Sequence, residues 1–221
     1  MKKVVIGLTG IYLVAVGFFI GVTDRESMFD SVKWTDIGTL IVTFLGFTFG
    51  FYTYFQWLNN KRKEDSYIAA KRYIASIDEI EENLHELRFH YDHICPVPGV
   101  VVEDQSVSIK RVEHLNNVWG NLYQARRSLY KSNRELSFWN VRLDDSAIKN
   151  YESMNQYLDS ISVVSSVLNS QLYHFVSGNM QNMGEVISHK KRFDELHSQL
   201  HEAIQHRISR GFKSMFLFEI Q

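Results

Sequence analysis

Histidine is the residue type in this chain with the widest chemical repertoire, and four of its nine histidines form two close pairs. In the segment HSQLH, His197 and His201 are four residues apart, so on a helix they share one face at the spacing of metal ligands. The glutamate of an H-E-x-x-H metal-binding sequence is missing there. His90 and His93 form the second pair, close to Cys95. Because histidines on a polar helix face are usually solvated, we predict no metal site at either pair.

The sequence contains no signature of catalysis. It has no phosphate-binding P-loop, no dinucleotide-binding glycine motif and no nucleophile elbow. Its single cysteine, Cys95, excludes an internal disulfide framework and is consistent with a reducing compartment. We therefore expect a protein that is not an enzyme and that needs no cofactor.

Aromatic and arginine residues alternate along one predicted helix, over residues 107–136. Leucines recur every seven residues from Leu115 to Leu136, and they define its buried face. At 100° per residue, five aromatic and arginine side chains fall within an arc of roughly 80° on one flank of that face. Aromatic rings stack on bases and guanidinium groups bind phosphates, so the flank predicts a site for a phosphate-bearing ligand. Its residues are Trp119, Tyr123, Arg127, Tyr130 and Arg134.

The distribution of charge leaves two alternatives to a small ligand open for this flank. Residues 110–142 contain seven Lys or Arg and two Asp or Glu, a net of +5, whereas residues 78–104 contain one and eight, a net of −7. The basic helix can therefore pack beside the acidic segment, or it can bind an anionic protein. A second basic cluster begins the predicted last helix, where free N–H groups favour anions. It adds Lys190 and Arg192 to the predicted ligand site.

Two uncharged and largely apolar runs, residues 4–22 and 37–58, predict membrane spans. As helices they are roughly 28 and 33 Å long at about 1.5 Å per residue, and the hydrocarbon core is about 30 Å thick. A cleaved signal peptide is the alternative for the first run. That run is longer than the usual apolar core of such peptides, and no A-x-A-like cleavage site follows it. We expect a transmembrane hairpin over residues 1–60.

Basic residues near the ends of the spans predict their orientation. Lys2 and Lys3 precede the first span, and three basic residues at positions 61–63 follow the second. The connecting loop, residues 23–36, holds two basic and four acidic residues. Because positive charge is retained on the cytoplasmic side, we expect both termini in the cytoplasm and the protein in the inner membrane of the cell.

Each apolar run also contains a G-x-x-x-G pair, formed by Gly17 with Gly21 and by Gly46 with Gly50. Small residues let helix backbones approach closely in lipid, so these pairs predict helix packing, within one chain or between copies. Two spans cannot enclose a pore, so any channel would need a homo-oligomer. Neither run contains an ionisable residue, which argues against a pump or a proton relay.

The remaining chain, residues 61–221, predicts a cytosolic all-α domain. Its apolar residues recur at steps of three, four and seven. We expect Ser106 or Ser108 to cap one helix and Gly211 to end the last one. Four amphipathic segments indicate a helical bundle. The expected helices are 64–94, 107–136, 146–176 and 186–210, separated by a loop at 95–106, a break at SFWNVRLDD and a turn at 177–185.

This layout resembles the two-span membrane effectors of prokaryotic antiviral defence. The matching features are the runs VVIGLTGIYLVAVGFFIGV and IGTLIVTFLGFTFGFYTYFQWL, the KRK junction and the all-helical remainder. The class that it resembles most is the accessory membrane effector of type III CRISPR systems that is gated by cyclic oligoadenylate. The resemblance implies a C-terminal domain that assembles as a tetramer and binds cyclic tetra-adenylate, not duplex nucleic acid. It also implies that the membrane part impairs the envelope of the infected cell.

Two further interpretations fit the same sequence. The two-span toxic effector of certain retron defence systems has a similar layout. A membrane-anchored interaction protein, whose bundle docks a protein partner through the same aromatic and basic flank, has it too.

Overall fold

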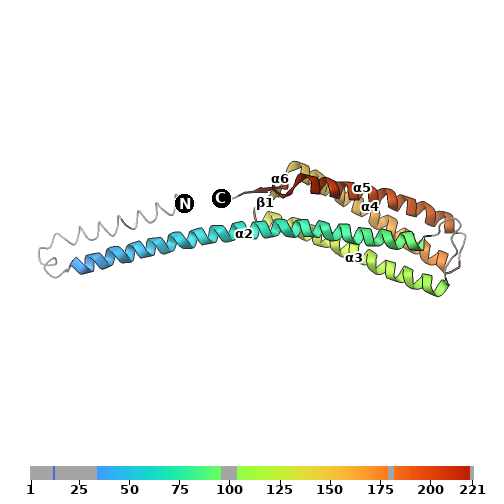
Figure 1. Ribbon diagram of the computed structural model, residues 1–221, viewed down its shortest axis with the longest axis horizontal. Coiled ribbons are helices and arrows are strands. Elements are labelled where there is room, and N and C mark those ends of the chain that lie inside the picture. Colours follow the sequence, from blue (N-terminus) through green and yellow to red (C-terminus); the bar gives the residue numbers. More distant parts are fainter. Residues whose placement is uncertain (1–11, 13–33, 96–103, 179–181, 220–221) are drawn as a thin grey trace. The chain divides into compact units, whose positions relative to one another are not determined.

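The computed structural model describes Tyr12 and residues 34–95, 104–178 and 182–219 (Figure 1). The described part is mostly helical, as predicted, with one small two-stranded sheet. The chain divides into two compact units, Met1–Asn59 and Asn60–Gln221. The long helix α2 (Trp34–Ile94) contributes residues to both units.

In the first unit, α2 contains the one candidate membrane span among the described residues, which begins at Gly38. Three threonine side chains in this stretch are satisfied within the helix, which suits a span in lipid. The hydroxyls of Thr43, Thr48 and Thr53 each donate a hydrogen bond to the carbonyl oxygen four residues earlier. The other predicted span, 4–22, lies outside the described residues apart from Tyr12, and so do Gly17 and Gly21.

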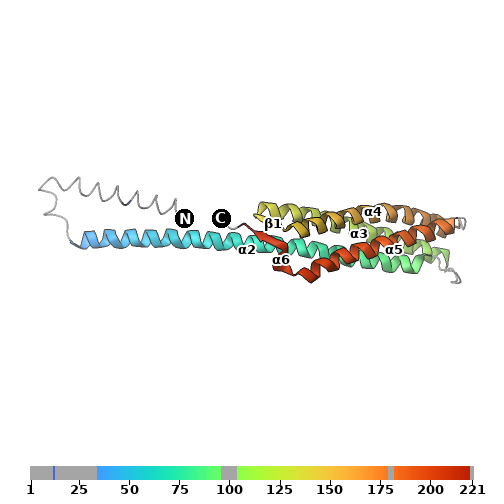
Figure 2. The ribbon, with the colours of Figure 1, turned by 90° about the horizontal axis from the view of Figure 1, so that it is seen from above.

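The second unit is a bundle of four helices. The last part of α2 packs with α3 (Gln105–Phe138), α4 (Asp145–Val176) and α5 (Met183–Arg210), as Figures 1 and 2 show. Arg72 of α2 forms a hydrogen bond with Glu135 of α3, and Ser76 of α2 forms one with Ser132 of α3. The residue numbers rise along α2 while those of the partners fall along α3, so these two helices are antiparallel. Interhelical hydrogen bonds and ion pairs follow the same pattern between α3 and α4 and between α2 and α5. The topology is therefore up-down-up-down.

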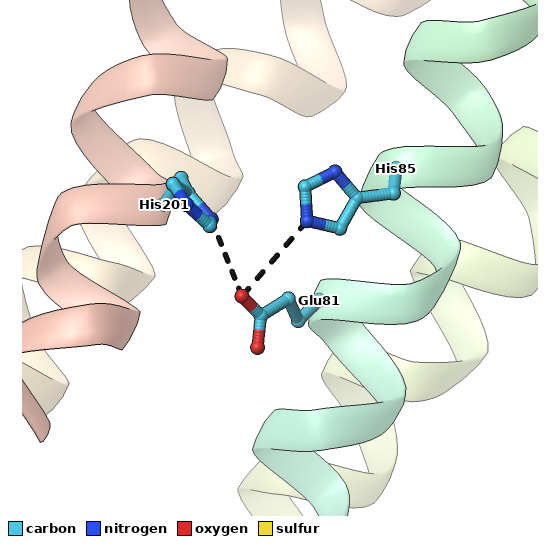
Figure 3. A group of neighbouring side chains, drawn as sticks. All are labelled: Glu81, His85 and His201. Carbon is cyan, nitrogen blue, oxygen red and sulfur yellow. Dashed lines mark ion pairs between the residues drawn. The ribbon is translucent and has the colours of Figure 1, made fainter. Parts of the chain in front are cut away.

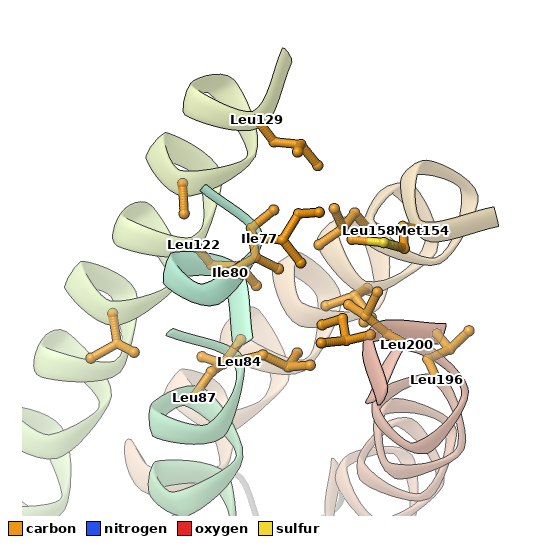
Figure 4. Close-up of a cluster of buried hydrophobic side chains, with 14 of the residues drawn as sticks. Ile77, Ile80, Leu84, Leu87, Leu122, Leu129, Met154, Leu158, Leu196 and Leu200 are labelled. Carbon is orange, nitrogen blue, oxygen red and sulfur yellow. The ribbon is translucent and has the colours of Figure 1, made fainter. Parts of the chain in front are cut away.

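The bundle core consists of the apolar positions that recur every three, four or seven residues (Figure 4). The heptad leucines of α3 are all buried, which confirms the predicted inner face of that helix. Their burial removes apolar surface from water, which is the main favourable term in folding. The other helices contribute Ile77, Ile80, Leu84 and Leu87 from α2, Met154 and Leu158 from α4, and Leu196 and Leu200 from α5.

The helix ends differ from the predicted ones in two respects. The N-cap of α3 is Asp104, whose carboxylate accepts a hydrogen bond from the backbone N–H of Ser106, so neither predicted serine caps this helix. The last helix, α5, begins at Met183, inside the predicted turn. Gly211 follows its end at φ 74°, a conformation that favours glycine, and the prediction of this helix end is confirmed.

A small sheet closes one end of the bundle and was not predicted. Strands β1 (Val141–Leu143) and β2 (Phe216–Phe218) pair antiparallel, with Arg142 opposite Leu217. The short helix α6 (Phe212–Met215) leads into β2. The sequence showed only a break after α3 and an apolar tail after α5, because strands of three residues have no measurable period.

Replacing Phe193 with alanine tests the core. Its side chain is fully buried and its ring centroid lies 4.7 Å from that of Tyr91, so the cavity should lower the free energy of unfolding by about 3–5 kcal/mol. Denaturant unfolding followed by circular dichroism measures this loss. Phe89→Ala is the matched control, because Phe89 is 58% exposed on α2. Equal losses in the two variants would contradict the placement of Phe193 in the core.

Candidate functional site

The seam between α3 and α4 contains a surface hollow lined by three of the five residues predicted on the α3 flank. The hollow has a volume of about 280 Å³. Tyr123 and Tyr130 beside it are 54% and 59% exposed. An aromatic side chain this exposed is available for stacking. The lining residues are Tyr123, Arg126, Arg127 and Tyr130 from α3 and Asn155 from α4.

The arginines around this hollow differ in their partners. Arg126 is partly buried and forms an ion pair of 2.6 Å with Asp159 of α4, which fixes it to the bundle. Among the described residues, no carboxylate pairs with Arg127 or with Arg134, and both are exposed. A guanidinium group without a protein partner keeps its five N–H donors for an anion. Arg127 is therefore the group best placed to bind phosphate at the hollow.

Trp119 lies in a second hollow of the same seam, of about 300 Å³, together with Asn169 and Tyr173 of α4. A hydrogen-bond chain that runs from the buried Tyr91 to the exposed Asn116 holds this region. Tyr91 of α2 donates to Asn169, which donates to Asn116 of α3, at 2.7 and 2.9 Å. Burial raises the pKa of Tyr91, so its phenol stays a hydrogen-bond donor at neutral pH. Trp119 is thus on the predicted flank but outside the hollow with Arg127, and Arg134 lines neither hollow.

The acidic segment of α2 faces α5, although the sequence also allowed it to lie against α3. Arg207 of α5 binds Asp78 at 2.7 Å, and Lys190 of α5 binds Asp92 at 2.6 Å. Between α2 and α3, the described structure has the ion pair of Arg72 with Glu135. In this pair α2 supplies the basic residue and α3 the acidic one, which is the reverse of the expected arrangement. The basic flank of α3 is therefore not explained by pairing with the acidic segment of α2.

Lys190 and Arg192 do not join the predicted ligand site. The ammonium group of Lys190 contacts Asp92 and also Asp194 at 2.7 Å, and its side chain is only 14% exposed. Burial lowers the pKa of Lys190, but the hydrogen bonds that its ammonium group donates to Asp194 and Asp92 outweigh that effect and raise it overall. Arg192 pairs with Glu195 on its own helix at 2.9 Å. The partners on the same helix, Asp194 and Glu195, were visible in the sequence at helical spacing, whereas the contact of Lys190 with Asp92 of α2 was not.

The histidines occupy different surroundings from those predicted. His197 is not solvated but buried, at 2% exposure, and its Nε2 atom has no hydrogen-bond partner among the described residues. His201 meets Glu81 and His85 of α2 (Figure 3). His90 packs against His114 of α3, with ring centroids 4.7 Å apart, while His93 packs on Phe89.

Two groups of three side chains in the described structure have ligand atoms close enough for a metal ion, within 4.8 Å of one another. They are Glu81, His85 and His201, and Glu86, His90 and His114. In each group the glutamate precedes a histidine of α2 by four residues. That spacing was visible in the sequence, but the third ligand comes from another helix and was not.

No protein-family model, curated protein or solved structure matches this chain. Its function is therefore inferred from the chemistry of its own residues.

The buried His197 makes stability depend on pH. Burial, and next the charge of Arg88, lower the pKa of His197 from 6.5 to about 4. Between these values the unfolded chain binds more protons, so the free energy of unfolding should fall as the pH decreases from about 6.5 to about 4. Denaturant unfolding with a chelator present, repeated at several pH values, measures the slope.

The variant His197→Gln should show a shallower slope over that range than the parent protein. His174→Gln is the control for the loss of one histidine, since His174 is exposed on α4. An unchanged slope in His197→Gln would show that another group controls the acid sensitivity.

Proposed function

We propose that this protein is a membrane effector of antiviral defence, whose helical bundle binds a cyclic oligoadenylate and thereby alters the membrane part. The observation that carries the proposal is the hollow in which Arg127, without a carboxylate partner in the described structure, lies between Tyr123 and Tyr130. Stacking surfaces beside a free guanidinium group suit a ligand that has both bases and phosphates.

The shape of the site favours a ligand shared between copies of the chain. The hollow is shallow and lies on the outside of the bundle, so one copy would cover only part of a cyclic nucleotide. A symmetric homo-oligomer, a tetramer in the class that the layout resembles, would present the same arginine and tyrosines several times around one ligand. The second hollow, with Trp119, extends the same seam and would contact further bases.

The membrane part of the proposal rests on α2 and on the first apolar run. The ring of Tyr12, from that run, lies 5.6 Å from the ring of Phe44, which fits two spans packed as a hairpin. The basic residues before the first run and at positions 61–63 would keep both termini in the cytoplasm. An added Cβ at Gly46 or Gly50 would meet no described atom within 4 Å. In this proposal a helix of another copy packs against these two glycines, which is the packing that a G-x-x-x-G pair favours.

Signal transfer would use the continuity of α2. Residues 34–94 form one helix, and its last part contacts every other helix of the bundle. A ligand that binds two arrangements of the bundle with different affinity shifts their populations, whereas equal affinity shifts nothing. In this proposal the arrangement that binds the ligand better is also the one that activates the membrane part.

Titration of the full-length protein in detergent with cyclic tetra-adenylate tests the ligand. The variant with both Arg127→Ala and Arg134→Ala should bind at least about tenfold more weakly, since a hydrogen bond to a charged group contributes about 1.5–3 kcal/mol. Isothermal titration calorimetry measures the affinities. The control variant, Arg142→Ala with Arg192→Ala, removes the same charge from residues that already pair with Glu219 and Glu195.

Absence of binding by the parent protein to any cyclic oligoadenylate would overturn the proposed ligand. Equal binding by both double variants would leave the ligand in place and overturn the site on α3.

A protein partner is the second candidate, favoured by an exposed apolar pair on α4. Val163, at 66% exposure, and Val167 follow Asp159 at steps of four residues. They therefore continue the face of α4 that borders the hollow. In a membrane-anchored interaction protein these residues would be covered by the partner. Val163→Asp would then abolish co-purification of that partner and leave nucleotide binding unchanged.

Breaking α2 between the two units tests the transfer of the signal. Asn60→Pro removes a helix hydrogen bond and introduces a clash with the preceding turn. We expect it to abolish ligand-dependent toxicity in cells while ligand binding by the purified protein stays within twofold of the parent. Asn60→Ala, which preserves the helix, is the control. Toxicity that survives the proline would mean that this part of α2 serves only as a tether.

A further inference from the structure

We propose that Glu81, His85 and His201 form a binding site for Zn²⁺ or a similar transition-metal ion, which links α2 to α5. This site is separate from the hollow on α3 and does not depend on the proposed nucleotide function.

The distances between the three ligand atoms suit one small ion. The Oε1 atom of Glu81 lies 3.2 Å from Nδ1 of His201 and 3.9 Å from Nε2 of His85, and all the ligand atoms are within 4.8 Å. Ligands that bind tetrahedral zinc at 2.0–2.1 Å are about 3.3 Å apart. The group therefore needs only small side-chain rotations, which the partly exposed His85 can make.

The three side chains are already directed toward one point. Glu81 and His85 are one turn apart on α2, and His201 approaches them from α5, so that both imidazoles converge on the same carboxylate oxygen (Figure 3). Gln205 donates a hydrogen bond of 2.9 Å to that oxygen. Such an outer contact orients a ligating carboxylate.

The Nδ1 atom of His201 supplies a second, independent observation. It is buried, and in spite of its distance of 3.2 Å from Glu81 it is not aligned for a hydrogen bond with any described residue. A buried nitrogen without a hydrogen bond costs free energy, about 1–3 kcal/mol. A metal ion that accepts its lone pair would remove this cost. A simple ion pair between a protonated histidine and Glu81 would instead align the N–H with the carboxylate.

The donor set selects the class of metal. Two imidazoles and one carboxylate suit Zn²⁺ and Co²⁺, whereas Mg²⁺ and Ca²⁺ prefer oxygen ligands alone. Arg88, three residues after His85 on α2, is offset by Asp92 at 3.7 Å and Asp194 at 4.0 Å. His197, whose ring centroid is 5.3 Å from that of His85, is buried beside the group and shields it from water.

The other group, Glu86, His90 and His114, provides a comparison within the same chain. Its glutamate and its α3 histidine are exposed, whereas Glu81 is 19% exposed and His201 is 38% exposed. Better coverage by protein excludes water and strengthens a metal site. We therefore assign the ion to the group between α2 and α5.

Metal titration of the full-length protein, purified in detergent without a polyhistidine tag and treated with a chelator, tests this site. Calorimetry with Zn²⁺ should give saturable binding, and Co²⁺ should give the intense visible absorption of a tetrahedral centre. His85→Gln and His201→Gln should each weaken binding at least tenfold, because even outer contacts contribute 10–100-fold. His174→Gln should bind as the parent does. Circular dichroism confirms that each variant is folded.

The variants of the two groups give distinguishable outcomes. Binding that is lost in His85→Gln and kept in His114→Gln supports the site. If the parent protein binds a second ion at Glu86, His90 and His114, the loss of one of the two ions in His85→Gln supports it equally. No saturable binding by the parent, parental affinity in His85→Gln, or loss only in His114→Gln would overturn it. His85 is half exposed, so its variant stays informative if His201→Gln fails to fold.

Discussion

The packing of four leucine-rich helix faces against one another is the constraint on which the rest of this structure depends. Leu84, Leu122, Leu158 and Leu200, one from each helix, are at most 3% exposed. Each inner face is a narrow stripe, so burying it fixes the rotation of its helix about its own axis. Every other side chain is then assigned to a flank, and the flanks determine which polar groups meet and which remain open.

Charge has two different roles on these flanks. The acidic flank of α2 turns to α5, where Arg207, at 5% exposure, pairs with Asp78, and Lys190 bridges two aspartates. These cations stabilise the bundle and are not available to a ligand. On α3, Arg127 has no carboxylate partner among the described residues and stays exposed beside two tyrosines. Basic residues of similar appearance in the sequence are thus structural at Lys190 and Arg207 of α5 and accessible at Arg127 of α3.

The helix α2 connects the proposed activities. It carries the candidate membrane span, two ligands of the proposed metal site and the buried Tyr91, which reaches α4. A metal ion held between α2 and α5 would resist their separation, so it would favour one arrangement of the bundle over another. The metal would then act on α2 directly, and the nucleotide would act on it through α3 and α4, which pack against it.

The sequence by itself determined the helical class, the heptad faces, the apolar stretch of α2 and the helix end at Gly211, because each depends on residues close together in the chain. It also placed Tyr123, Arg127 and Tyr130 on one flank, since helical spacing alone fixes that. Only the tertiary structure decided that Lys190 pairs with Asp92, that His197 is buried, that β1 meets β2, and that His201 lies beside His85. These contacts join residues far apart in the sequence, and they depend on how each helix is rotated when the apolar faces are buried together.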